Sequence, residues 1–240
     1  MRLIGDKIKM NIAIILSGGT GTRMQLSIPK QYVEVDDKPI IGYAIDTFQK
    51  TYIVDKIVIV CHNDWKQYIM NYLSLNSITK VCAIAESGAT RQESILNGLL
   101  ACEQFADKND IVIIHDAARP LVTEDLIVKL TDFGPYDGVL PVIHVKDTLY
   151  YSDKGDSISQ LLDRDKIYAG QAPESFIFGK YLKINKKATS EELKNTRGTS
   201  EIAFKNGLKI KLIDGDENNY KITTINDLEK FKNTIMEREK

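Results

Sequence analysis

Residues 11–32 read NIAIILSGGTGTRMQLSIPKQY, a strand pattern that leads into a glycine-rich loop. It opens with an apolar run, 11–16, of the kind that forms a strand buried on both faces of a parallel sheet. The run leads directly into a loop with three glycines, followed by Arg23 and by Lys30 behind a proline. Glycines leave backbone amides open to an anion, and the two cations add charge. The stretch therefore predicts a loop that closes around an anionic group; the alternative is a tight turn beside solvated cations.

Similar runs recur along the chain and alternate with helical patterns. Strands are predicted at 56–61, 80–85, 110–114, 137–143 and 208–213, and helices near 40–50, 63–74, 90–105, 123–133, 176–186, 190–206 (a weak pattern) and 224–238. Buried strands that alternate with helices indicate a mostly parallel sheet between two helix layers, joined by right-handed crossovers. The predicted fold is a Rossmann-like, three-layer α/β/α fold.

The segment at about 144–170 breaks this alternation. It reads as two strands around a Lys-Gly turn at 154–155. A hairpin of this length is marginal on its own, so we expect a partner to cover it. We therefore predict one domain, residues 1–240, with a protruding β-arm that forms a homodimer.

Composition narrows the function classes. Lys and Arg (32) nearly balance Asp and Glu (33), and a net charge of -1 gives no footprint for nucleic acid or an anionic membrane. No apolar run reaches the roughly 18–20 residues of a membrane span, and the first residues lack the pattern of a signal peptide. Three widely spaced cysteines without a CxxC pair are typical of free thiols. We expect a cytoplasmic protein whose anion site is local.

Two further motifs follow predicted strands. IHDAARP, residues 114–120, places Asp116 at the carboxyl end of a strand, where open sheets bind ligands and where an oxygen ligand suits Mg²⁺. The alternative is a surface turn pair of Asp116 and Arg119, and His115 alone is more often structural. GATRQES, residues 88–94, opens a helix, whose first turn offers free amides. By itself that motif predicts only a capped helix.

These motifs together resemble the cytidylyltransferases that act on 2-C-methylerythritol 4-phosphate and on ribitol 5-phosphate. The resemblance rests on GGTGTRM, PKQY, GATRxxS, HDAARP, KDT and NYKITT, which occur in order between about residues 11 and 238. It implies transfer of CMP from CTP to a polyol phosphate, with release of pyrophosphate and with Mg²⁺. It also implies roles for single residues. The catalytic residues would be Arg23, Lys30 and Lys221, which would bind the phosphates, and Asp116 would contact Mg²⁺. The acceptor would be bound by Arg119, Thr148 and Arg164, of which the last two would reach the neighbouring subunit's site. The nucleotide would be bound by Leu16, Ser17, Gly18, Gly19, Thr20, Gly21, Gly88, Arg91, Ser94, Asp116 and Ala117.

The CMP transfer that the resemblance implies needs positively charged side chains but no catalytic base. The second ionisation of the acceptor phosphate lies at about pH 6, so the phosphate is already a nucleophile at neutral pH. The barrier is repulsion between two anions and charge growing on the α-phosphate, which positioned cations relieve.

The sequence departs from the family pattern in the segments that the resemblance assigns to binding of the acceptor phosphate. Ala172 stands where the methylerythritol enzymes carry the threonine of AxTPQ, and 168–176, YAGQAPESF, is more similar to the ribitol-phosphate enzymes. The TD(D/E)AS segment is replaced near 197–201 by RGTSE, and Lys146 takes a place often held by arginine. A ribitol phosphate or related acceptor is therefore favoured, with the isoprenoid precursor as the alternative. A non-catalytic nucleotide-binding module and a hexose 1-phosphate nucleotidyltransferase are less consistent with the cations and with HDAARP.

Overall fold

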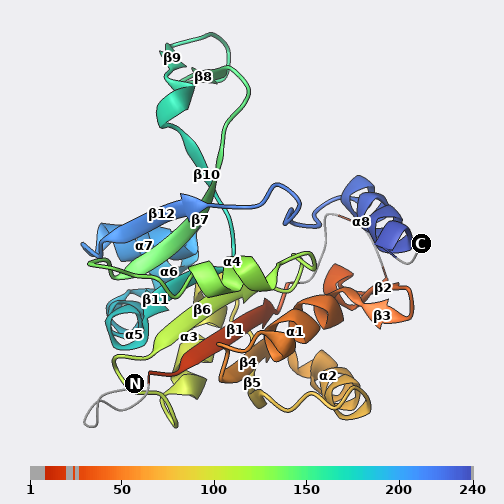
Figure 1. The fold of residues 1–240 in the computed structure, drawn as a ribbon. Coiled ribbons are helices and arrows are strands. Elements are labelled where there is room, and N and C mark those ends of the chain that lie inside the picture. The colour runs from red at the N-terminus through yellow and green to blue at the C-terminus, as the bar shows by residue number, and fades with distance from the viewer. Residues whose placement is uncertain (1–8, 20–23, 25–26, 239–240) are drawn as a thin grey trace.

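The architecture is a twisted sheet with helices on both faces and a long β-arm, as the computed structural model shows for residues 9–19, 24 and 27–238 (Figure 1). The sheet order is β10-β7-β11-β6-β1-β4-β5, with β12 beside β7. Its strands are β1 (Asn11–Ser17), β4 (Lys56–Cys61), β5 (Val81–Glu86), β6 (Ile111–Asp116), β7 (Gly138–His144), β10 (Tyr168–Gly170), β11 (Glu174–Ile177) and β12 (Ile210–Asp214). Among these strands, β10 and β11 run antiparallel to the others. The predicted α/β class with a mostly parallel sheet is confirmed.

Helices cover both faces of the sheet because its strands are apolar on both sides. In β1, Ala13 and Ile15 pack toward one layer, and Ile12 and Ile14 toward the other. The first layer contains α1 (Ile40–Lys50), α2 (Asn63–Leu75) and α4 (Glu124–Lys129). The second contains α3 (Arg91–Cys102), α5 (Phe178–Lys187), α6 (Ser190–Asn195) and α7 (Thr199–Lys205). In the described part of the chain, no helix has both the length and the apolar character needed to cross a bilayer.

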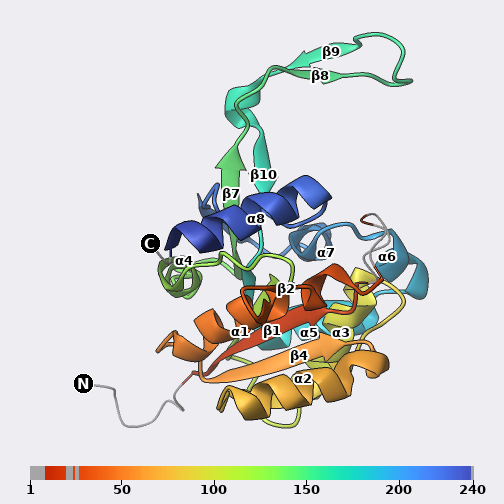
Figure 2. The same ribbon diagram turned by 90° about the vertical axis from the view of Figure 1, so that its right-hand side faces the viewer.

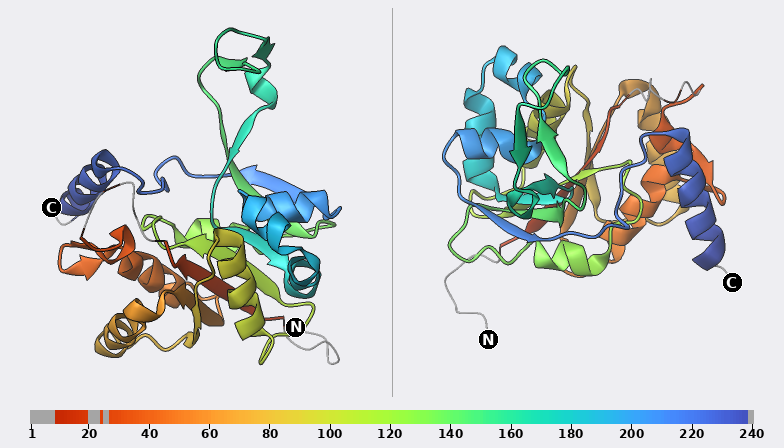
Figure 3. Two further views of the ribbon diagram at one scale, coloured as in Figure 1. Left: turned by 180° about the vertical axis from the view of Figure 1, so that it is seen from behind. Right: turned by 90° about the horizontal axis from the view of Figure 1, so that it is seen from above.

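A third cluster attaches the closing helix, α8 (Ile225–Arg238), to the start of the chain. The ring of Phe231 packs edge-on against Tyr43, at 5.0 Å between centroids. The small hairpin of β2 (Glu34–Val35) and β3 (Lys38–Pro39) lies beneath the same helix. Seen from behind, α8 and the α5–α7 group lie on opposite sides of the molecule (Figure 3). The chain between β12 and α8 therefore crosses the molecule before α8 begins.

The β-arm projects far from the sheet (Figure 2). Its base is the antiparallel pairing of β7 with β10, and its tip is the pair β8 (Leu149–Tyr151) and β9 (Gln160–Leu162). The tip turn includes Gly155 at φ +81°, a conformation that glycine adopts without strain. The arm and its Lys-Gly turn are thus confirmed as structure, while its role in a dimer stays a prediction.

Three helices differ from the sequence prediction, and the one expected near 123–133 ends at Lys129. The helix expected near 176–186 begins only at Phe178, because the residues before it form β11 in the middle of the sheet. The weak helix expected near 190–206 is two helices, since Thr196 and Gly198 have extended backbone. This break brings the first turn of α7 toward β11, which matters for the site.

Candidate active site

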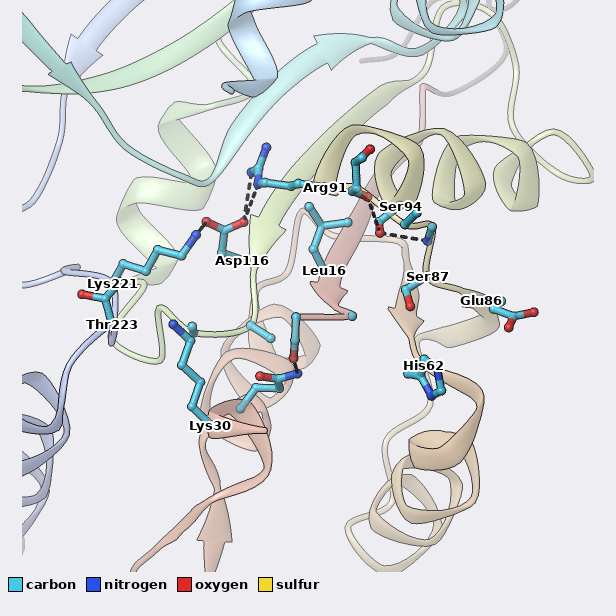
Figure 4. A pocket seen from close by; sticks show the side chains of 18 residues that line it. Leu16, Lys30, His62, Glu86, Ser87, Arg91, Ser94, Asp116, Lys221 and Thr223 are labelled. Carbon is cyan, nitrogen blue, oxygen red and sulfur yellow. Dashed lines mark hydrogen bonds and ion pairs between the residues drawn. The ribbon is translucent and has the colours of Figure 1, made fainter. Parts of the chain in front are cut away.

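The carboxyl ends of four parallel strands meet at one edge and open into a cavity of about 670 Å³ (Figure 4). Leu16 of β1 is in register with Asp116 of β6, so these two strand ends lie side by side. Loops after β1, β4 and β5 add Gly18, His62 and Ser87 to the lining. The place is the one where open parallel sheets bind ligands, and the volume suits a nucleotide-sized molecule.

The glycine loop is pinned by close packing and by one buried amide. A Cβ on Gly18 would lie 2.2 Å from Cβ of Ser87, so only glycine lets the β1 and β5 loops approach each other. Gly19 meets nothing within 4 Å and faces open space. Nε2 of Gln31 donates to the carbonyls of Ser17 (2.8 Å) and Gly19 (2.7 Å) and so fixes the backbone of the loop.

The turn that carries Lys30 is held by an aromatic stack. Lys30–Tyr32 form a single 3-10 turn, η2. The Tyr32 ring stacks on Trp65 at 4.1 Å, and the Ser17 hydroxyl donates to the Tyr32 hydroxyl at 2.8 Å. Because α2 carries Trp65, the first helix layer fixes the position of Lys30 at the mouth of the cavity.

Asp116 is the centre of the charged part of the site. Its Oδ1 accepts from Nε (3.1 Å) and Nη2 (2.9 Å) of Arg91, and its Oδ2 accepts from Nζ of Lys221 (2.8 Å). Figure 4 shows the three side chains in a row across the cavity. Burial alone would raise the pKa of Asp116, but Arg91 and Lys221 hold that pKa well below its usual range. The carboxylate is therefore ionised and couples two cations that lie far apart in the sequence.

The start of α3 closes the other side of the cavity. Thr90 and Glu93 form a capping box, so the helix N-terminus is satisfied by its own side chains. The Ser94 hydroxyl accepts from the amide of Gly88 at 3.0 Å and donates to the carbonyl of Thr90 at 2.9 Å. These contacts hold the Gly88 turn against the helix and shape the cavity wall.

Most of the predicted site residues line this one cavity. They are Leu16, Gly18, Gly19, Lys30, Gly88, Arg91, Ser94, Asp116, Ala117 and Lys221. Thr20, Gly21 and Arg23 lie outside the described residues. Ser17 instead lines a small adjoining pocket of about 180 Å³.

The three predicted acceptor residues do not line the cavity of their own chain. Nη1 of Arg119 donates to the carbonyl of Asn219 at 2.7 Å, beside the site rather than in it. Thr148 and Arg164 belong to the arm, where Arg164 donates to the carbonyl of Lys146 at 2.7 Å. A role for Thr148 and Arg164 in a neighbouring subunit stays a prediction. The alternative surface pair of Asp116 and Arg119 is excluded, since Asp116 is buried in its ion pairs.

His115 is structural, as its position in the sequence suggested. The ring is fully buried, packs 5.2 Å from Phe48, and its Nε2 lies 3.1 Å from the carbonyl of Arg119. Burial lowers the pKa of His115 to about 4, so the imidazole is neutral at physiological pH.

Sequence reasoning missed several residues of the lining. They are Gln31, His62, Glu86, Ser87, Ala89, Thr90, Ala118 and Thr223. Gln31 lies in the motif PKQY and Thr223 in KITT, but the sequence analysis gave neither residue a role of its own. His62 and Glu86 follow from topology alone, because they stand at the ends of β4 and β5.

The residues present fit a magnesium ion that arrives with phosphates. Among the described residues, no group of three or more His, Cys, Asp or Glu side chains could hold a metal by itself. Mg²⁺ commonly uses one or two carboxylates and takes its remaining ligands from substrate phosphates and water. Each oxygen of a carboxylate has two acceptor positions, so Oδ2 of Asp116 keeps one beside Lys221.

Comparison with known proteins shows the family of this chain. The family described as "IspD: 2-C-methyl-D-erythritol 4-phosphate cytidylyltransferase" matches residues 11–238. A ribitol-5-phosphate cytidylyltransferase of Streptococcus agalactiae serotype Ia is 35% identical over 225 residues, 93% of this chain and 94% of that protein. A 2-C-methyl-D-erythritol 4-phosphate cytidylyltransferase of Clostridium acetobutylicum is 34% identical over 221 residues, 91% of this chain and 94% of that protein.

Solved structures show the same similarity. The crystal structure of a 4-diphosphocytidyl-2C-methyl-D-erythritol synthase from Anaerococcus prevotii superposes with a TM-score of 0.78 at 25% identity and covers 95% of this chain and 96% of that one. The resemblance inferred from the motifs is therefore confirmed over almost the whole chain. This chain belongs to the IspD family of cytidylyltransferases.

Proposed function

We propose that this protein transfers CMP from CTP to a polyol phosphate and releases pyrophosphate. The observation that carries the proposal is the convergence of Lys30 and Lys221 on one cavity, together with the bare Gly18–Gly19 backbone and Asp116. A scaffold or a passive binding module has no need for cations that converge from distant segments.

The cavity supports direct attack by the acceptor. An oxygen of the polyol phosphate attacks the α-phosphorus of CTP, a new P–O bond forms, and the bond to the β-phosphate breaks as pyrophosphate leaves. The acceptor phosphate is largely ionised at neutral pH, so no side chain has to remove a proton. Lys30 and Lys221 offset the repulsion between the anions and the charge that grows on the α-phosphate.

Ribitol 5-phosphate, or a related polyol phosphate, is the acceptor that we favour. The support comes from the ribitol-5-phosphate cytidylyltransferase relative and from Ala172 in place of a threonine. Ala172 is buried, and its carbonyl accepts from Nδ2 of Asn219 at 2.8 Å, so this position offers an acceptor no side-chain hydroxyl. The second candidate is 2-C-methyl-D-erythritol 4-phosphate, which the family description and the clostridial relative favour.

Three further features complete the proposal. Mg²⁺ would be held by Asp116 and the triphosphate, and when bound it would neutralise phosphate charge. A homodimer would form through the β-arm, whose tip exposes Tyr150, Ile158 and Leu161. Cytoplasmic location is supported by three free cysteines, Cys61, Cys82 and Cys102.

A substrate panel tests the proposal. Pyrophosphate release is measured with CTP, UTP, ATP and GTP, each against ribitol, methylerythritol and glycerol phosphates in the presence of Mg²⁺. We expect release with CTP and ribitol 5-phosphate, and less with methylerythritol phosphate. Activity with UTP alone, or with none of the four nucleotides, contradicts the proposed function.

A further inference from the structure

A buried acid lies behind the ion pairs of the active site. Glu174 opens β11, is 7% exposed, and does not line the cavity. An ionised carboxylate in such a place has to be paired or hydrogen-bonded. The groups around Glu174 therefore indicate what it does.

One hydroxyl from the first turn of α7, that of Ser200, contacts this carboxylate. The Ser200 hydroxyl donates to Oε2 of Glu174 at 2.5 Å. Burial raises the pKa of Glu174 above its usual value, although the hydrogen bond from Ser200 and the charge of Arg91 act in the opposite direction. The bond from Ser200 thus ties Glu174 to the first turn of α7.

Thr199 connects this group to the active site. Its Oγ1 accepts from Nη1 of Arg91 at 2.7 Å, while Nε and Nη2 of the same guanidinium donate to Asp116. The fork of Arg91 is therefore held at both ends, by a carboxylate in the cavity and by a buried hydroxyl. A planar guanidinium held in this way cannot rotate without breaking one of the two contacts.

The charges along the chain of contacts alternate. Lys221 is paired with Asp116, Asp116 with Arg91, and Arg91 is attracted by Glu174 as well as by Asp116. Arg119 adds another positive charge near Asp116. The contact that ties Glu174 to this row is the hydrogen bond from Ser200, the neighbour of Thr199 on which Arg91 is held.

From these contacts we infer that Glu174 is a positioning residue for nucleotidyl transfer. It accepts from Ser200 and so holds the first turn of α7, whose Thr199 anchors Arg91; Arg91 in turn fixes Asp116 and with it Lys221. The inference rests on the proposed function for its kinetic consequence. It gives a role to the RGTSE segment at 197–201, which stands where the family pattern is interrupted.

Paired substitutions separate positioning from simple destabilisation. Glu174→Gln keeps the shape and removes the charge, and Thr199→Val removes the hydroxyl that holds Arg91. We expect kcat to fall about tenfold in each, the size typical of residues that orient the groups in direct contact with the reaction, with the KM for CTP changed less than about threefold. Thr199→Ser keeps the hydroxyl and should restore kcat.

Asp110 offers a matched control. Its carboxylate is also buried, at 2% exposed, but lies before β6, where its partners in the described part of the chain are the amides of Met10 and Asp107. Asp110→Asn should lower the melting temperature and leave kcat unchanged. A kcat in Glu174→Gln and Thr199→Val equal to that of the wild type overturns the inference.

A second readout does not depend on activity. The Nε–H of Arg91, which donates to Asp116, gives its own signal in a ¹⁵N-edited NMR spectrum. We expect this signal to shift or broaden in Glu174→Gln and Thr199→Val and to stay in place in Asp110→Asn. An unshifted signal overturns the inference, even if the wild type releases no pyrophosphate; that last result would contradict the proposed function alone.

Discussion

Nζ of Lys221 lies 2.8 Å from Oδ2 of Asp116, although 105 positions separate the two residues. Asp116 ends β6 in the middle of the sheet, whereas Lys221 lies on the segment that crosses to α8. The pair therefore joins the end of the chain to the centre of the sheet. It also keeps a lysine at the edge of the cavity that would bind the phosphates.

Loss of the Asp116 charge should damage both stability and turnover. Asp116→Asn leaves Arg91 and Lys221 without their shared counter-ion, and removal of one partner from a buried pair typically costs about 3–5 kcal/mol. We expect a clear fall in the free energy of unfolding by urea and a large fall in kcat. Glu103→Gln, which breaks an exposed pair with Lys186, should cost only about 0–1 kcal/mol. Equal effects of the two variants would contradict the central place of Asp116.

The amide of Gln31 should control nucleotide affinity. Gln31→Leu keeps the approximate size of the side chain but loses the two bonds that fix the carbonyls of Ser17 and Gly19. Each lost bond to a buried group is worth about 1 kcal/mol, so we expect the KM for CTP to rise about tenfold or more. Gln67→Leu, on the exposed face of α2, serves as the control. An unchanged KM in Gln31→Leu would show that the loop does not need the amide.

Asp227 should make the stability of the closing segment depend on pH. Its carboxylate accepts from the amides of Thr223 and Thr224 and from the Thr223 hydroxyl. Burial is the largest single effect and raises the pKa of Asp227, but the hydrogen bonds together outweigh it and lower the pKa to about 2. The unfolded value is about 3.9. The stabilisation is therefore complete above about pH 4 and is lost as the pH falls toward 2.

Asp227→Asn measures this contribution. At pH 7 we expect it to lower the free energy of unfolding by about 1 kcal/mol, as for the loss of a helix cap. The difference from the wild type should shrink as the pH falls from 4 to 2. Glu229→Gln, in an exposed pair with Lys232 on the same helix, should show no such trend. A difference that is the same at pH 7 and pH 2 would argue against the ionised cap.

The arm should hold two copies of the protein together. Tyr150, Tyr151 and Leu161 are 58%, 49% and 63% exposed at its tip. Replacement of all three by serine should convert a dimer into a monomer in sedimentation velocity. Replacement of Tyr52 and Leu75, which are 79% and 85% exposed elsewhere on the surface, should leave the mass unchanged. A wild type that stays monomeric at high concentration would remove the arm from any role in assembly.

The sequence predicts the long elements of this fold because their patterns are unambiguous. β1, β4 and β6 are apolar on both faces, and the predicted helices at 40–50 and 63–74 agree with α1 and α2 nearly to the residue. β11 was missed because its four residues, ESFI, contain two polar side chains. Those side chains are polar for a tertiary reason: Ser175 donates to the carbonyl of Leu130, and Glu174 accepts from Ser200.

The sequence motifs predicted most residues of the site, but not the hydrogen bonds and ion pairs between them. Lys30 and Asp116 were predicted from their positions after two strands and Lys221 by resemblance, and the structure brings all three to one cavity. The contact of Arg91 with Thr199 spans 108 positions and depends on the break between α6 and α7. No local pattern reports such a contact, because it arises only when the layers pack.

The central claim is that Lys30 and Lys221 act together on the phosphates, and kcat for pyrophosphate release tests it most directly. Lys211 is the matched control, since its side chain is 29% exposed and paired with Asp132, as that of Lys221 is 37% exposed and paired with Asp116. We predict that Lys30→Ala and Lys221→Ala each lower kcat on the order of 100-fold, while Lys211→Ala has the wild-type kcat. Near-normal kcat in either Lys30→Ala or Lys221→Ala would contradict the account.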